Sequence, residues 1–183
     1  MTKQALLVMD VQKAIVDRFT GDDGYLPRLR GAIDAATGAG VPVIYVVIGF
    51  RPGFPEISTR NKIFNATRSA GGFSGDAMEV PADVAPRPGD IVVTKKRVSA
   101  FAGSDLEMVL RAGEIDSLVL TGIATSGVVL STLRQAADLD FALTVLSDGC
   151  LDGDPEVHRV LTEKVFPHQA DVVTVDEWVK SVS

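Results

Sequence analysis

The sequence contains very little cysteine and histidine. Among its 183 residues there is one cysteine, Cys150, and there are two histidines. A single cysteine excludes an internal disulfide and is typical of a reducing compartment, so we expect the protein to work in the cytoplasm. One cysteine and two histidines are also too few for the usual ligand sets of a zinc site. We therefore predict no bound metal and no cofactor.

The sequence also lacks an excess of positive charge and any long apolar run. The 18 Lys and Arg against 24 Asp and Glu give a net charge of −6, whereas binding to nucleic-acid phosphates needs clustered basic side chains. The longest apolar runs, such as PVIYVVIGF (42–50), are far shorter than the ~18 residues that a membrane span needs. The early run ALLVMD has no small-residue cleavage site after it, which is typical of a buried strand rather than a signal peptide. We expect neither nucleic acid nor a membrane as a partner.

Length and composition are those of one globular domain. A chain of 183 residues with 46% hydrophobic and 23% charged residues is ordinary for a soluble domain of ~100–200 residues. We therefore expect residues 1–183 to form a single domain.

Short apolar runs alternate with helical patterns along the chain. This alternation predicts an α/β fold with a parallel sheet covered by helices on both faces. Strands are expected at residues 5–10, 42–48, 90–95, 117–122, 142–148 and 171–175. Helices are expected at 26–40 with Leu29 and Ile33 facing inward, at 104–113 with Ser104 as N-cap, at about 126–139, and at 153–166 with Asp154 as cap.

The segment 49–89 interrupts this alternation. It is rich in glycine and proline and contains no recognisable regular element. Loops of this length inside a domain are usually functional or disordered. Apolar anchors favour an ordered flap over a free linker: Phe50, Phe54, Ile57, Phe64 and Phe73.

Polar groups follow three of the predicted strands. Asp10 ends the first strand, Lys95 ends the third, and GIATSG (122–127) follows the fourth. In a doubly wound sheet, ligands bind beyond the carboxyl ends of the strands. If these strands are neighbours, a carboxylate, an ammonium and a helix N-terminus converge on one crevice. Taken singly, Asp10 is as readily a helix cap, Lys95 a solvated side chain, and GIATSG an ordinary turn.

Four segments in order resemble the isochorismatase-like cysteine hydrolases, which include nicotinamidases, N-carbamoylsarcosine amidases and isochorismatases. The segments are LLVMDVQ, KKRVSAF, GIATSGVVLSTLRQAADLDF and VLSDGCLDGDPEVH. The resemblance spans nearly the whole chain. It implies a three-layer α/β/α fold with a mainly parallel, Rossmann-like sheet of about six strands. It further implies a homo-oligomer, a dimer or a tetramer, and a strained peptide bond near Gly122–Ala124.

The resemblance implies catalysis by an Asp, a Lys and a nucleophilic Cys, and the last of these is missing. By motif the Asp is Asp10 and the Lys is Lys95, while the cysteine position holds Val128. Valine has no lone pair and no acidic proton, so thiolate catalysis is excluded there. Cys150 follows the next strand and is expected to pack as a small buried residue.

Loss of the cysteine leaves three hypotheses open. Isochorismatases of this family also lack it and hydrolyse a vinyl ether, with the Asp as general acid toward a substrate carbon, although they carry glycine where Val128 fills the space. Asp10 and Lys95 support such chemistry if burial raises the pKa of the carboxyl. The leading hypothesis is thus a hydrolase that acts without a covalent cysteine on an anionic vinyl ether or amide. The alternatives are a catalytically inactive binding or oligomeric paralogue that keeps the pocket, and amide hydrolysis that recruits Ser126.

Further residues near these motifs are expected to bind a small-molecule substrate. They are Gln12, Phe19, Arg97, Phe101, Ala124, Thr125, Ser126 and Gly127. Because a guanidinium suits a carboxylate, the arginines Arg51, Arg60 and Arg97 are candidates for an anionic group, although a solvated side chain is the simpler interpretation of each. Ser126 is more simply the N-cap of the following helix. GFRPGFPEIS (49–58), which corresponds to the metal-binding region of nicotinamidases, contains no histidine.

Overall fold

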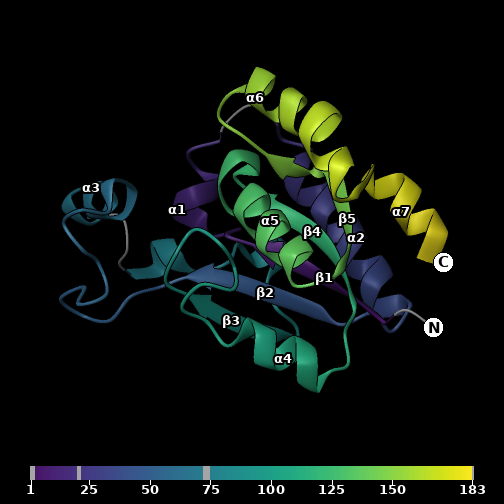
Figure 1. The fold of residues 1–183 in the computed structure, drawn as a ribbon, viewed down its shortest axis with the longest axis horizontal. Helices are drawn as coiled ribbons and strands as arrows, with labels where there is room; N and C mark the ends of the chain where they lie inside the picture. The colour runs from purple at the N-terminus through teal and green to yellow at the C-terminus, as the bar shows by residue number, and fades with distance from the viewer. Residues whose placement is uncertain (1–2, 20–21, 72–74, 183) are drawn as a thin grey trace.

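The structure is a computed structural model that describes residues 3–19, 22–71 and 75–182 (Figure 1). Phe73, one of the predicted anchors, lies outside the described residues. The described strands are β1 (Gln4–Met9), β2 (Val43–Ile48), β3 (Ile91–Lys95), β4 (Ser117–Ile123), β5 (Ala142–Leu151) and β6 (Asp171–Val173). They form one parallel sheet in the order β3-β2-β1-β4-β5-β6. All six predicted strands are therefore present, and β5 continues past its predicted end at residue 148.

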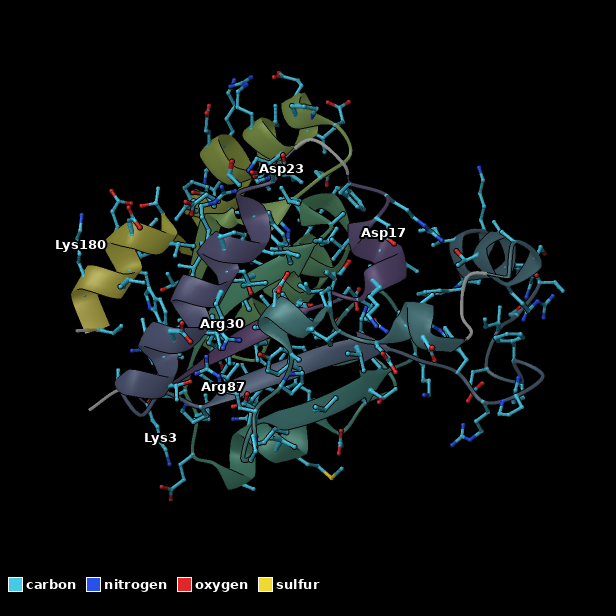
Figure 2. All side chains as sticks on the ribbon, turned by 180° about the vertical axis from the view of Figure 1, so that it is seen from behind. Lys3, Asp17, Asp23, Arg30, Arg87 and Lys180 are labelled. Atoms are coloured by element: carbon cyan, nitrogen blue, oxygen red, sulfur yellow. The ribbon has the colours of Figure 1, made fainter. Side chains whose placement is uncertain are left out.

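Helices cover both faces of this sheet. The described helices are α1 (Lys13–Val16), α2 (Tyr25–Gly38), α3 (Lys62–Ser69), α4 (Leu106–Ala112), α5 (Leu130–Asp138), α6 (Pro155–Val160) and α7 (Val175–Val182). One face packs against α4 and α5 through Leu110 and Leu133. The other packs against α2 and α7 (Figure 2, where Arg30 marks α2 and Lys180 marks α7) through Leu29 and Trp178. The predicted three-layer α/β/α architecture is confirmed.

Strand β1 shows how the sequence builds these layers. Successive side chains of a strand point to opposite faces, and Leu7 and Met9 pack in the cluster under α4 and α5 while Leu6 and Val8 pack under α2 and α7. Both faces are apolar, so β1 lies at the centre of the sheet, between β2 and β4. The chain leaves β1 for β2 on one side and later returns to β4 on the other. This reversal places a ligand crevice at the carboxyl end of β1.

The predicted helix ends are mostly confirmed. Leu29 and Ile33 are fully buried in α2, and Asp154 caps α6 by accepting hydrogen bonds from two backbone N–H groups. Ser104 is not the N-cap of α4, which is Asp105; the Ser104 hydroxyl instead accepts a hydrogen bond from the N–H of Leu106.

The helix after β4 also has a different N-cap from the predicted one. A π turn over Thr125–Val129 precedes α5, and its N-cap is Ala124, without a side-chain bond. The expectation that Ser126 caps this helix is therefore wrong. Ser126 lies inside the helical turn, which begins one residue earlier at Thr125, so its hydroxyl is not at the capping position. Its backbone N–H donates to Asp152 at 2.7 Å.

The expectation that residues 49–89 lack a regular element is also wrong. They contain α3 and two 3-10 turns, Gly75–Met78 and Ala82–Val84. The side chain of Asn61 caps α3 by accepting the N–H of Phe64, and Phe64 packs with Ile48 and Ile57. Such a short helix carries too few turns to show a periodic pattern. In Figure 1 α3 stands out from the other helices, at one end of the molecule. Among the described helices none is long and apolar enough to span a bilayer.

Candidate active site

Asp10 and Lys95 meet at the carboxyl ends of the strands. Asp10 directly follows β1, and Lys95 is the last residue of β3. Strand β2 separates the two, so the contact depends on the length of the lysine side chain, whose Nζ lies 2.8 Å from Asp10 Oδ2. Asp10 has a left-handed backbone (φ 57°), and its N–H donates to the carbonyl of Val46. The chain thus turns out of the strand at the residue that carries the carboxylate.

The ammonium of Lys95 is fully engaged. Besides the ion pair with Asp10, its Nζ donates to the carbonyls of Arg97 at 3.0 Å and Val98 at 2.8 Å. An ammonium has three N–H donors, so this geometry commits all of them. The Lys95 side chain is 2% exposed. It can therefore act as a fixed positive charge beside Asp10 rather than as a group that contacts a ligand.

Asp10 keeps one oxygen unengaged. Its Oδ1 is buried and has no hydrogen-bond partner among the described residues. Burial raises the pKa of the Asp10 carboxyl from 3.8 to about 6, against the lowering effect of the charge and the hydrogen bond of Lys95. A buried carboxyl of this kind holds its proton at pH values where an ordinary aspartate has lost it. The pKa of Asp10 is thus shifted in the direction that general acid chemistry requires.

A hollow of about 260 Å³ opens beside this pair. Six of the sequence-predicted site residues line it: Asp10, Phe19, Lys95, Ala124, Gly127 and Val128. Sequence reasoning did not identify the others, which are Ile15, Arg18, Ile48, Ile63, Phe64, Thr67, Met78, Val98 and Ile123. The rule that ligands lie beyond strand ends points to Ile48 and Ile123, the last residues of β2 and β4, but no motif marks Arg18.

Two predicted binding residues are engaged elsewhere. Gln12 is buried, and its amide exchanges hydrogen bonds with the backbone of Ile48, accepting at 2.9 Å and donating at 3.2 Å. The guanidinium of Arg97 donates to two backbone carbonyls, one of them that of Glu56 at 3.0 Å. Neither side chain lines the hollow. Both tie segment 49–89 and its neighbours to the sheet.

Three more predicted binding residues also lie outside the hollow. Phe101 is buried in the core under α4 and α5. The hydroxyl of Thr125 lies 2.8 Å from Nδ1 of His158, a half-buried side chain whose pKa burial lowers. Ser126 is exposed, with its backbone N–H on Asp152. Their expected roles in binding remain predictions that the geometry does not support.

The arginines proposed for an anionic group do not reach the hollow. Arg51 pairs with Glu56 at 2.6 Å and is 72% exposed, and Arg60 is exposed on the same segment. The arginine that lines the hollow is Arg18, in the turn that follows α1.

A second hollow of about 470 Å³ adjoins the first and shares Arg18 and Phe19 with it. Cys150 lies in its wall but is 1% exposed, and burial raises the pKa of its thiol to about 12. Cys150 is thus the small buried residue that was expected. In the part of the chain that the structure describes, no three His, Cys, Asp or Glu side chains come together as a metal site.

Gly122 allows β1 and β4 to approach closely at the site. A Cβ atom there would lie 2.1 Å from the carbonyl oxygen of Met9, and the φ angle of Gly122 is +138°. The peptide bond that follows Ile123 is cis, where the sequence implied an unusual bond near Gly122–Ala124. The glycine of GIATSG is therefore required by contact with the strand that carries Asp10.

Residues 4–177 match the family model described as Isochorismatase domain. Ureidoacrylate amidohydrolase RutB of Variovorax paradoxus (strain S110) is 34% identical over 202 residues, which cover 97% of this chain and 80% of the relative. The uncharacterized isochorismatase family protein YecD of Escherichia coli O157:H7 is 31% identical, over 94% of this chain and 93% of the relative. The solved N-carbamoylsarcosine amidase of Thermoplasma acidophilum superposes with a TM-score of 0.76 at 27% identity, over 96% of this chain and 98% of that chain. An isochorismatase family protein of Burkholderia thailandensis gives a TM-score of 0.85 at 25% identity, over 98% and 95% of the two chains.

Proposed function

This chain belongs to the isochorismatase family, and we propose that it is a small-molecule hydrolase in which Asp10 acts as a general acid without a covalent cysteine. One observation carries the proposal. Asp10 lines the hollow with a pKa raised to about 6, one of its oxygens is fixed by Lys95 and the other is buried without a partner among the described residues, while Val128 occupies the position of the family's nucleophile. A protonated carboxyl in such a place is suited to proton donation.

The substrate that suits this acid best is a vinyl ether. The proton of Asp10 Oδ1 passes to the terminal carbon of the double bond, whose electrons form the new C–H bond. The positive charge that develops on the adjacent carbon is shared with the ether oxygen. Water adds to that carbon, and the resulting hemiketal collapses to a ketone and an alcohol while a proton returns to Asp10. No step needs a nucleophilic side chain at position 128.

Lys95 has a positioning role in this proposal. Its three N–H groups are committed to Asp10 and to two backbone carbonyls, so it holds Oδ2 in place and leaves Oδ1 without a partner among the described residues. Its charge stabilises the carboxylate that remains after the proton leaves. The pair therefore serves both halves of the catalytic cycle.

Amides remain the second candidate substrate class. The relative in Variovorax paradoxus is by its name an amidohydrolase of ureidoacrylate. An enamide, in which nitrogen replaces the ether oxygen, is cleaved by the same protonation at carbon. A saturated amide instead needs a nucleophile at its carbonyl carbon, and Val128 supplies none. Ser126 does not substitute for it, since this residue is exposed and does not line the hollow.

One observation favours a binding paralogue without catalysis. Val128 is buried and fills the wall of the hollow where isochorismatases carry glycine and cysteine hydrolases carry cysteine. A chain that has lost its chemistry but kept its fold retains such a pocket. We further propose, from the low cysteine content and the family resemblance, that the protein works in the cytoplasm as a homo-oligomer, a dimer or a tetramer.

Product detection by NMR separates the two functions. Mixtures of vinyl-ether carboxylates, enamides and carbamoyl compounds are incubated with the wild-type protein, with Asp10→Asn and with the control Asp83→Asn, which changes an exposed carboxylate away from the hollow. We expect product with wild type and Asp83→Asn, and a rate lower by about 10²- to 10⁴-fold with Asp10→Asn. Line broadening of a compound without product from any variant would instead support the binding paralogue.

A further inference from the structure

We propose that Arg18 determines specificity by binding the carboxylate of a substrate whose body is apolar. The proposal rests on the hydrolase site described above and names the class of molecule that the site accepts. It assigns a role to an arginine that none of the sequence motifs contains.

Arg18 lies where the two hollows meet. It ends the turn that follows α1, its backbone N–H donates to the carbonyl of Ile15, and the residue lines both hollows. Figure 2, in which the neighbouring Asp17 is labelled, shows this end of α1 between the body of the molecule and α3. Among the described residues its guanidinium has no ion pair and no hydrogen bond. A guanidinium without a partner at the mouth of a hollow is available to an anion.

The acidic residues that line the second hollow form no ion pair with Arg18, and two of them face Arg28 instead. Asp22 pairs with Arg28. Asp148 lies 3.7 Å from Arg28 and accepts the N–H of Val175 at 2.7 Å.

Asp152 accepts backbone N–H groups, one of them at 2.7 Å. In the hollow itself, the charges of Asp10 and Lys95 offset each other while Asp10 is ionised. Of the described charges that line the hollow beside Asp10, that of Arg18 is therefore the one without a counter-charge.

The rest of the lining is apolar and selects for the body of the ligand. Apart from Asp10, Lys95, Arg18 and Thr67, the residues around the hollow carry no polar side-chain group. Buried polar groups of a ligand that find no partner weaken its binding. A molecule rich in amide groups, such as a ureido acid, would leave such groups unpaired here. An aryl- or alkyl-substituted carboxylate buries its body and presents one anionic group to Arg18.

The test measures binding and needs no turnover. The probes are trans-cinnamate and its neutral isostere benzalacetone, in which a methyl ketone replaces the carboxylate. Their Kd values are measured by NMR titration with wild type, Arg18→Ala and the control Arg134→Ala, which removes an exposed arginine of α5 that lines neither hollow. We expect wild type and Arg134→Ala to bind cinnamate about five- to tenfold more tightly than benzalacetone, which is the size of one charge-assisted contact near solvent. Arg18→Ala should lose this preference and bind both probes alike.

The outcomes separate this proposal from the hydrolase proposal. A preference for cinnamate that persists in Arg18→Ala, or no binding of cinnamate by wild type, overturns the role of Arg18 whether or not the protein turns over a substrate. Loss of the preference in Arg18→Ala supports it even if no hydrolysis is found. The spectra of the variants report their folding in the same experiment.

Discussion

At the scale of single residues, the site depends on an asymmetry between the two oxygens of Asp10. Oδ2 is held at 2.8 Å by Lys95, whereas Oδ1 has no partner among the described residues. Desolvation of the carboxyl exceeds the stabilising effect of the lysine, so the pKa of Asp10 rises to about 6 instead of falling. The result is a carboxyl that is anchored by Lys95 and is still about half protonated near pH 6.

Position 128 gives a direct residue-scale prediction. Val128→Cys places a thiol in the wall of the hollow beside Asp10, at the cost of about 1 kcal/mol or less of folding free energy, because little volume is lost. We expect this variant to react with iodoacetamide faster than the wild type, because position 128, although Val128 is only 2% exposed, lines the hollow beside Asp10. The wild type should react slowly, since its one cysteine, Cys150, is buried and has a thiol pKa raised to about 12.

Mass spectrometry of the labelled protein locates the modified residue. Equal, slow labelling of wild type and Val128→Cys would mean that position 128 does not face the hollow. The same variant, assayed with simple amides, tests whether a thiol is the missing part of an amidase. Val128→Ala controls for the change of volume.

At the scale of elements, the close contact of β1 and β4 fixes the crevice. Gly122→Ala places a Cβ atom 2.1 Å from the carbonyl oxygen of Met9 in a backbone conformation with φ of +138°. We expect a loss of about 3 kcal/mol or more in the free energy of unfolding, because strand β1 must move. The matched control is Gly31→Ala in α2, where a Cβ meets nothing within 4 Å; it should raise stability by about 0.5–1 kcal/mol. Urea unfolding measures both, and equal effects of the two substitutions would contradict this account of Gly122.

The sequence predicts elements well where one physical signal dominates. The six strands are apolar on one or both faces and bounded by turn residues, so each was located, and Asp154 was identified as a cap from its place before Pro155. Helix α3 was missed because it is short and draws its stability from one cap and one buried side chain, Phe64. The buried position of Phe64 becomes evident only from the structure, in which Ile48 and Ile57 pack beside it.

The candidate site, like the fold, is predictable from the sequence only in part. The meeting of Asp10 and Lys95 is predictable because the carboxyl ends of parallel strands converge and a lysine side chain is long enough to cross β2. Gln12 and Thr125 are close to the motifs in sequence, but their polar groups are satisfied by Ile48 and His158. Arg18 lies beyond a four-residue helix. Neither a hydrophobic periodicity nor a sequence motif predicts the direction of a side chain there.

At the scale of the whole molecule, the charge of the chain and the charge at the site have opposite signs. The net charge of −6 repels anions at a distance, within the limits set by salt. Arg18 can therefore attract a carboxylate only locally, at the junction of the two hollows. The strand reversal at β1 brings that junction and the Asp10–Lys95 pair to the same end of the sheet. Fold topology, rather than overall electrostatics, concentrates the chemistry there.

The most direct test of the central claim, that Asp10 is a general acid, is the pH dependence of kcat/KM between about pH 5 and 8 for the first compound that wild type cleaves. With a pKa of about 6, the protonated fraction of Asp10 falls tenfold for each pH unit above that value. The account predicts that kcat/KM falls in parallel, and that this fall is absent from the residual rate of Asp10→Asn. A kcat/KM that rises through pH 6, as for an aspartate acting as a base, or that stays level, would contradict it.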